Sequence, residues 1–132
     1  MQHSKPAPVF TDNRGSITDI LAKVPLDAVT IIRSNKGVVR GNHYHKNTVQ
    51  WIYLQSGRLK SLTQTGDAPV VAGILEPGDL LLTEALEKHA IIALEDSEFF
   101  VFTHGPRGGD GYEDDTYPLE IPLEAVEIKL QA

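Results

Sequence analysis

The sequence predicts an all-β protein built as a barrel of two antiparallel sheets. Short apolar or alternating runs recur along the chain, and clusters of Gly, Pro, Asn, Asp and Ser separate them. No segment of ten residues shows a convincing amphipathic helical pattern. Many short strands at such regular spacing are typical of sandwiches and barrels.

The length of 132 residues suits one domain with a single core, spanning residues 1–132. Residues 1–8 are polar and proline-rich, so we expect a flexible lead-in. Residues 104–118 begin with a glycine-rich run and are expected to form a mobile loop, and residues 119–132 are expected to form terminal strands. The other predicted strands are 16–21, 29–33, 38–45, 49–55, 58–65, 70–75, 80–83, 89–94 and 98–103.

Composition narrows the class of protein and its partners. The chain has no cysteine, which excludes disulfides and thiolate metal sites. It has no apolar run long enough to span a membrane and no apolar signal segment at its start, so the cytoplasm is the expected location. The net charge of −6 argues against nucleic-acid binding. Most Lys and Arg lie in the first half of the chain, and most Asp and Glu lie in the second half. Either the acidic residues form an ordinary solvated surface, or the basic first half lines an anion-facing side of the barrel.

The most informative stretch is GVVRGNHYHKNTVQWIYLQSG, residues 37–57. His43 and His45 are two residues apart, so an extended strand directs both imidazoles to the same face. In the next strand, Ile52 and Leu54 are expected to face the core, and Gln50 shares their face. Two imidazoles on one face suit either a divalent metal or a pair of proton-transfer groups.

Other side chains near this stretch have more than one interpretation. Trp51 and Tyr53 lie on the face opposite Gln50 and are expected to pack against another sheet or subunit. Arg40 is off the histidine face by strand parity, so it is either a surface charge or, if the strand end is irregular, a phosphate ligand. Arg107 lies in the glycine-rich run, which is either a mobile surface loop or a lid with Arg107 as an anion clamp.

The spacing of this stretch resembles the first motif of the cupin superfamily, with its RmlC-like jelly roll. A glycine, five residues, His-x-His, four residues, a polar acceptor, six residues and a glycine make up that motif. The acceptor is normally glutamate, and Gln50 is a departure. Pro77-Gly78-Asp79, an apolar strand and then His89 resemble the second motif. The resemblance implies a divalent metal (Zn, Fe, Mn, Ni or Cu) held by His43, His45 and His89, with Gln50 as a possible further ligand.

A shorter run is similar to a motif of the nucleotide-sugar ketoisomerases within the same superfamily. It reads Arg40-Gly41-x-His43-x-His45-Lys46, followed by Gln50. Those enzymes move a keto group around a deoxyhexose ring without metal and have glutamine in place of the glutamate. Related cupin domains of capsule-sugar enzymes carry a similar RGNHYH stretch and bind zinc. Both resemblances imply an activated sugar as the substrate.

Three hypotheses follow. The first is a metal-binding enzyme that performs isomerase or epimerase chemistry on a small polar metabolite such as a nucleotide-activated sugar. The second is a metal-independent sugar ketoisomerase that uses His43 and His45 as acid and base. The third is a non-catalytic binding or sensor domain. In each case the resemblance and the spare terminal strands imply a homodimer.

Overall fold

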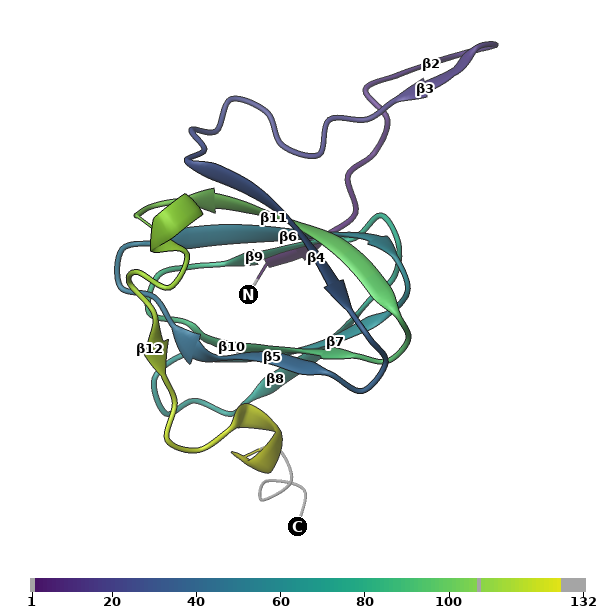
Figure 1. Ribbon diagram of the computed structural model, residues 1–132. Helices are drawn as coiled ribbons and strands as arrows, with labels where there is room; N and C mark the ends of the chain where they lie inside the picture. The colour runs from purple at the N-terminus through teal and green to yellow at the C-terminus, as the bar shows by residue number, and fades with distance from the viewer. Residues whose placement is uncertain (1, 107, 127–132) are drawn as a thin grey trace.

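The computed structural model describes residues 2–106 and 108–126, and it consists of two five-stranded antiparallel sheets that face each other (Figure 1). One sheet has the order β1-β9-β6-β11-β4 and the other β12-β5-β10-β7-β8, and β2 and β3 form a separate hairpin. The expected all-β jelly roll is confirmed. The strands are β1 Gln2–Ser4, β2 Phe10–Asp12, β3 Gly15–Ile17, β4 Ala28–Ser34, β5 Val39–Tyr44, β6 Val49–Ser56, β7 Leu59–Gln64, β8 Val71–Leu75, β9 Leu80–Thr83, β10 Lys88–Ala93, β11 Ser97–His104 and β12 Tyr117–Pro118, and η1 Gly109–Gly111 is a 3-10 turn.

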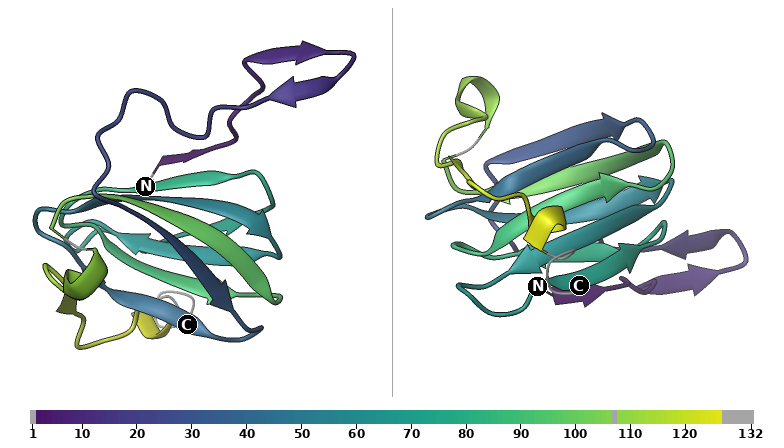
Figure 2. Two further views of the ribbon diagram at one scale, coloured as in Figure 1. Left: turned by 45° about the horizontal axis from the view of Figure 1, so that its top comes forward. Right: turned by 90° about the horizontal axis from the view of Figure 1, so that it is seen from below.

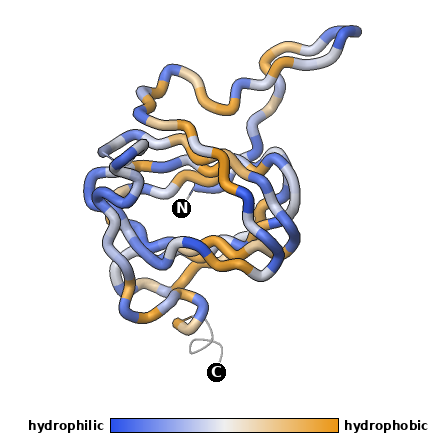
Figure 3. Tube along the Cα trace, viewed as in Figure 1, coloured by the Kyte–Doolittle hydropathy of each residue, from blue (hydrophilic) through white to orange (hydrophobic). Residues whose placement is uncertain are grey.

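The main core fills the space between the two sheets, and hydrophobic residues lie along strands of both sheets (Figure 3). On β6, Ile52 and Leu54 are buried, and so is Gln50, which confirms the expected inward face of this strand. Phe99 and Val101 of β11 lie beside them on the same face, because Val101 pairs with Ile52 and Phe99 with Leu54, and the facing sheet contributes apolar residues of β7 and β10 to the same cluster. Burying a side chain of this size contributes about 1.5–3 kcal/mol, so this cluster holds the sheets together.

A second, smaller cluster lies outside the barrel, on the far face of β10 and β7. Leu62 and Ala90 are buried there beneath Leu123 of the C-terminal segment. Residues 123–126 form a helical turn, so the expectation of a strand was wrong for them, and residues 127–132 lie outside the described part of the chain. The amides of Ala125 and Val126 donate to the Pro122 carbonyl, 3.0 and 3.2 Å away. Proline is favoured at helix starts, and an alternation over four residues does not distinguish a strand from a helical turn.

The N-terminal segment differs from the expected flexible lead-in. Residues 2–4 form β1, which pairs with Leu80–Leu82 of β9 and extends the first sheet by one strand. The chain then leaves the barrel and forms the β2–β3 hairpin, which projects from the body (Figures 1 and 2). Val9 and Phe10 near the hairpin start are exposed. Among the described residues, no helix is long and apolar enough to cross a membrane.

Candidate active site and metal centre

An irregularity in β5 organises the candidate site. β5 pairs with β10, but the register shifts between His89 and Ala90: His89 pairs with His43, and Ala90 pairs with Gly41. Asn42 is therefore an extra residue, and both Gly41 and Asn42 have positive φ angles, 91° and 58°. A β-bulge of this kind changes the face to which the following residues point.

The bulge explains why the parity argument was wrong for Arg40. Residues paired directly across an antiparallel ladder share a face. Arg40 pairs with Ile91, and Ile91 lies on the inner face as part of the core. Arg40 therefore points to the same side as His43 and lines the cavity described below. Its guanidinium is held by the wall, with Nε donating to Ser34 Oγ at 2.7 Å and Nη2 to the Arg33 carbonyl at 3.1 Å.

The structure brings together His43, His45 and His89 from two neighbouring strands and the residue after β5. The ring centroids are 4.8 Å apart for His43 and His45, 4.7 Å for His43 and His89, and 5.2 Å for His45 and His89. One ring nitrogen from each lies within 4.8 Å of the others. His45 and His89 are buried, whereas His43 is half-buried.

Two of the three rings are oriented by backbone carbonyls. Nδ1 of His45 lies 2.9 Å from the Asp115 carbonyl oxygen, and Nδ1 of His89 lies 3.1 Å from that of Glu87. A carbonyl only accepts, so in each neutral ring Nδ1 carries the proton and Nε2 carries the lone pair. Metal-binding histidines usually donate their second N–H to such a partner.

Gln50 faces the same interior. Its amide nitrogen donates to Thr103 Oγ1 at 3.3 Å, so any contribution to a metal must come from its carbonyl oxygen. The backbone carbonyl of Gln50 accepts from Thr83 Oγ1, also at 3.3 Å. These contacts hold the residue between β11 and β9, on the wall opposite the histidines.

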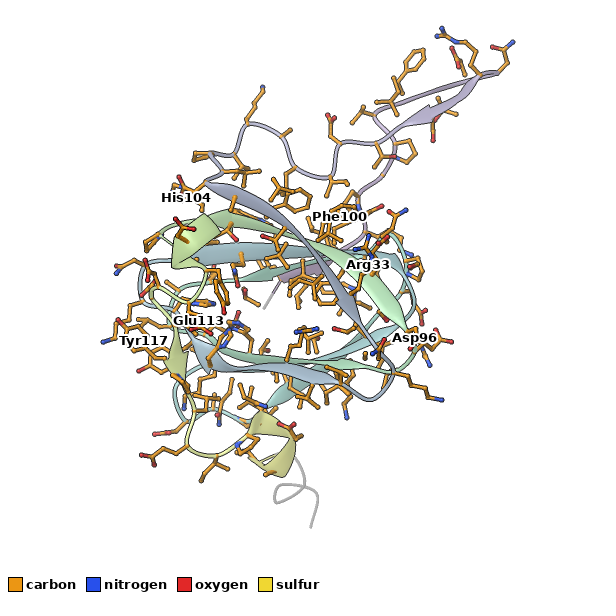
Figure 4. All side chains as sticks on the ribbon, viewed as in Figure 1. Arg33, Asp96, Phe100, His104, Glu113 and Tyr117 are labelled. Carbon is orange, nitrogen blue, oxygen red and sulfur yellow. The ribbon has the colours of Figure 1, made fainter. Side chains whose placement is uncertain are left out.

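A cavity of about 250 Å³ opens at this end of the barrel. Its polar wall includes His43, His89 and Gln50, and its apolar floor is formed by core residues such as Ile52. His45 is not among the lining residues and lies behind them. The segment after β11 crosses the mouth and adds Tyr112, Glu113 and Thr116 to the lining, and of these Glu113 and Thr116 were not singled out from the sequence. Figure 4 shows Glu113 beside the opening of the barrel.

The segment across the mouth is attached through Asp115. Its carboxylate accepts from the amides of Lys46 and Asn47, at 3.0 and 2.8 Å, and from Thr48 Oγ1 at 2.8 Å. Burial disfavours the charged form, but these hydrogen bonds and the nearby His45 outweigh it and hold the pKa of the Asp115 carboxyl below its usual value. The sequence signal was weak, because this residue sits in an ordinary run of acids after the glycine-rich stretch. Arg107 lies outside the described residues.

Comparison with solved structures establishes the fold. QdtA, a sugar 3,4-ketoisomerase from Thermoanaerobacterium thermosaccharolyticum, has a TM-score of 0.72 at 20% identity over 90% of this chain and 88% of that chain. The dTDP-4-dehydrorhamnose 3,5-epimerase from Sulfolobus tokodaii has a TM-score of 0.67 at 24% identity, covering 82% and 72%. This chain has the jelly-roll fold of these cupin-type proteins. Staphylococcus aureus CapF, a capsular polysaccharide assembling protein, shares this fold at a TM-score of 0.61 and 21% identity, but the match covers only 33% of CapF and 83% of this chain. No family model and no curated protein matches the sequence.

The two stretches that resemble cupin motifs in the sequence supply the three histidines of the cluster. The first motif supplies His43 and His45 from β5 and the residue after it, and the second supplies His89 from β10. At identities below 25% the likeness to solved structures concerns the fold alone. The chemistry must therefore be argued from the side chains of this chain.

Proposed function

We propose that this cupin is an enzyme that performs isomerase or epimerase chemistry on a nucleotide-activated sugar. The observation that carries the proposal is the convergence of three imidazoles beside a cavity that also contains Arg40. Proteins with the same fold support the substrate class. QdtA structures were determined in complex with TDP and, for a variant with one histidine replaced by asparagine, with TDP-4-keto-6-deoxyglucose.

The size of the cavity and the guanidinium of Arg40 agree with such a substrate. A volume of about 250 Å³ lies below the range of roughly 300–1,000 Å³ that encloses drug-sized ligands. The cavity therefore holds the sugar ring, and the nucleotide lies over the mouth. Arg40 supplies a guanidinium that suits a phosphate group at the mouth.

The chemistry requires a base that removes a proton from the carbon next to a sugar ketone and an acid that returns one elsewhere. A histidine titrates near neutrality and is suited to both steps. His43 lines the cavity, so it is the residue that we assign to direct proton transfer. His89 also lines the cavity, and its Nδ1–H bond to the Glu87 carbonyl leaves Nε2 as the basic nitrogen.

The donor set fits a divalent metal. His43, His45 and His89, with the carbonyl oxygen of Gln50, would hold Zn, Fe, Mn, Ni or Cu. Ligand nitrogens about 2.1 Å from a tetrahedral metal lie about 3.4 Å apart, so a pair of nitrogens at the present limit of 4.8 Å would have to close by about 1.4 Å. A metal held by these residues would polarise a substrate carbonyl and so make the neighbouring C–H more acidic.

The second candidate is a metal-independent ketoisomerase that uses His43 and His45. It agrees with the similarity to QdtA as well as the first candidate does. In that case His45 acts through His43, because His45 is buried behind the cavity wall and its ring centroid lies 4.8 Å from that of His43. The two candidates share the substrate and the proton chemistry. They differ in whether metal is required.

Hydrogen exchange with solvent tests the proposal. The protein is incubated with dTDP-4-keto-6-deoxy sugars in D₂O, and deuterium at the carbons next to the ketone is followed by NMR. We expect incorporation by the wild type, a loss of at least about 100-fold in His43→Ala, and no change in His104→Ala. His104 is a matched control because it is exposed and lies beside Asp27. No exchange with any sugar would leave the non-catalytic binding domain as the remaining hypothesis.

Metal analysis of protein purified without an affinity tag separates the two candidates. Stoichiometric metal that is lost in His89→Ala supports the metal enzyme. Exchange activity that persists in metal-free protein supports the ketoisomerase that uses the histidine pair.

We also propose that the protein is a homodimer formed through the outer face of the first sheet. Strand pairing places two apolar rows there, which are Val29–Phe102–Trp51–Leu82 and Ile31–Phe100–Tyr53–Leu80. Val29 and Ile31 are 59% and 49% exposed, which is unusual for neighbouring apolar residues on one face. Sedimentation analysis of Ile31→Glu tests this, with a shift from dimer to monomer expected. A wild-type monomer would refute it.

A further inference from the structure

Asp115, in the segment that crosses the cavity mouth, has two separate connections to the barrel. Its carboxylate binds the turn between β5 and β6 through Lys46, Asn47 and Thr48, and its own carbonyl accepts from Nδ1 of His45. One residue therefore fastens the segment to the barrel and at the same time contacts the buried ring.

The backbone of Asp115 shows why its side chain matters. Its φ angle is 55°, in the left-handed region that non-glycine residues rarely adopt. Such a conformation costs roughly 1–2 kcal/mol and persists only where surrounding contacts maintain it. The three hydrogen bonds to the carboxylate provide these contacts. They thereby fix the direction of the Asp115 carbonyl toward His45.

The geometry points to Asp115 as a positioning residue that couples closure of the segment over the cavity to the tautomer of His45. With the segment docked, the carbonyl requires a proton on Nδ1 and leaves the lone pair on Nε2. With the segment released, that constraint is lost and the ring samples both neutral tautomers. Glu113 and Thr116, on either side of Asp115, line the cavity, so the same movement alters the mouth.

This inference rests on the proposed use of His45, but its main test needs neither metal nor substrate. The ring nitrogens of ¹⁵N-histidine-labelled, metal-free protein are observed by NMR, which distinguishes protonated from unprotonated nitrogens. We expect His45 to be a single Nδ1–H tautomer in the wild type. In Asp115→Ala we expect a mixture of the two tautomers.

Two further variants sharpen the test. Asp115→Asn tolerates the left-handed conformation and keeps one acceptor oxygen, so we expect partial retention of the single tautomer. Asp110→Asn is the matched control, because it removes one negative charge from an exposed position on the same segment, in η1. We expect it to behave as the wild type.

Zinc titration supplies a second readout. Loss of such an orienting partner typically weakens metal binding about 10- to 100-fold, which we expect for Asp115→Ala and not for Asp110→Asn. A His45 ring that stays in the Nδ1–H tautomer in Asp115→Ala would overturn the inference, and so would an equal effect of Asp110→Asn. If the wild type binds no zinc, the proposed metal site fails, while the tautomer measurement still decides the role of Asp115. If Asp115→Ala does not fold, Asp115→Asn decides it.

Discussion

The bulge at Gly41 makes a sharp prediction for the substitution Gly41→Ala. A Cβ atom at this position would lie 2.8 Å from the His89 carbonyl oxygen and 3.2 Å from the Ala90 Cα. Real Cβ atoms essentially never approach a neighbour to below 3.0 Å, and both neighbours here are backbone. The substitution must therefore push β5 away from β10 at the point where His43 and His89 pair.

Gly37 provides a matched control for backbone strain. Its φ angle is 90°, against 91° at Gly41, but a Cβ there would meet nothing within 4 Å. Alanine in this left-handed conformation costs roughly 1–2 kcal/mol at either position. Gly41→Ala adds overpacking, worth about 1–3 kcal/mol. We expect the free energy of unfolding to fall by about 1–2 kcal/mol in Gly37→Ala and by about 2–5 kcal/mol in Gly41→Ala.

Urea unfolding followed by the fluorescence of Trp51, the only tryptophan, measures both variants. The folded variants are then titrated with zinc. Gly41→Ala should bind zinc at least about tenfold more weakly than Gly37→Ala, because displacement of β5 separates two of the three imidazoles. Equal loss of stability and unchanged zinc affinity in both variants would refute the close approach of β5 and β10 at the site.

Three other substitutions test the core, the proposed metal site and the contact with β1. Phe99→Ala should lower the free energy of unfolding by about 3–5 kcal/mol in the same urea assay, because Phe99 is 2% exposed within the main core. Gln50→Glu should tighten zinc binding by about tenfold or more, since a carboxylate next to a dication gains at least ~1.4 kcal/mol, and unchanged affinity would remove Gln50 from the ligand set. Burial raises the pKa of the Asp79 carboxyl, but the Glu76 amide, His3 and Lys5 outweigh it, so the pKa is lowered. Asp79→Asn should therefore cost about 1–3 kcal/mol at pH 7. In acid unfolding this difference should begin to shrink near pH ~4, where Asp79 of the unfolded chain becomes protonated, and should disappear only at lower pH, below the lowered pKa of the folded state.

The sequence was sufficient to predict which side chains point inward where the strands are regular. On β6 a strict alternation predicted which residues enter the core, and the structure agrees for Gln50, Ile52 and Leu54. The two histidine motifs predicted residues that lie together although His45 and His89 are far apart in the chain. The inward face of β6 could be predicted from the two-residue period of a strand, and the histidine cluster from motifs that are typical of the fold.

The sequence was insufficient to predict the direction of a side chain where one extra residue shifts the pairing register of two strands. Arg40 was assigned to the outer face because it is an odd number of positions from His43, and the extra residue Asn42 reverses that parity. The Gly41-Asn42 pair was a possible signal, because both residue types tolerate positive φ angles. The C-terminal turn was missed for a different reason, since Leu123 is ordered by a tertiary contact: its amide donates to Asn42 Oδ1 at 2.8 Å.

The bulge and the segment across the mouth together determine the charge of the site. Gln50 contributes no charge, so the barrel wall supplies only neutral candidate ligands and the cation Arg40. Among the described residues that line the cavity, the one carboxylate is Glu113, and it comes from the segment that Asp115 attaches. A docked segment therefore reduces the positive charge at the mouth, and a displaced one leaves Arg40 uncompensated and favours an anionic ligand. Closure of the segment therefore opposes entry of a nucleotide-linked sugar electrostatically. Glu113→Gln should bind a dTDP-sugar more tightly than the wild type does, and weaker binding by that variant would contradict this reasoning.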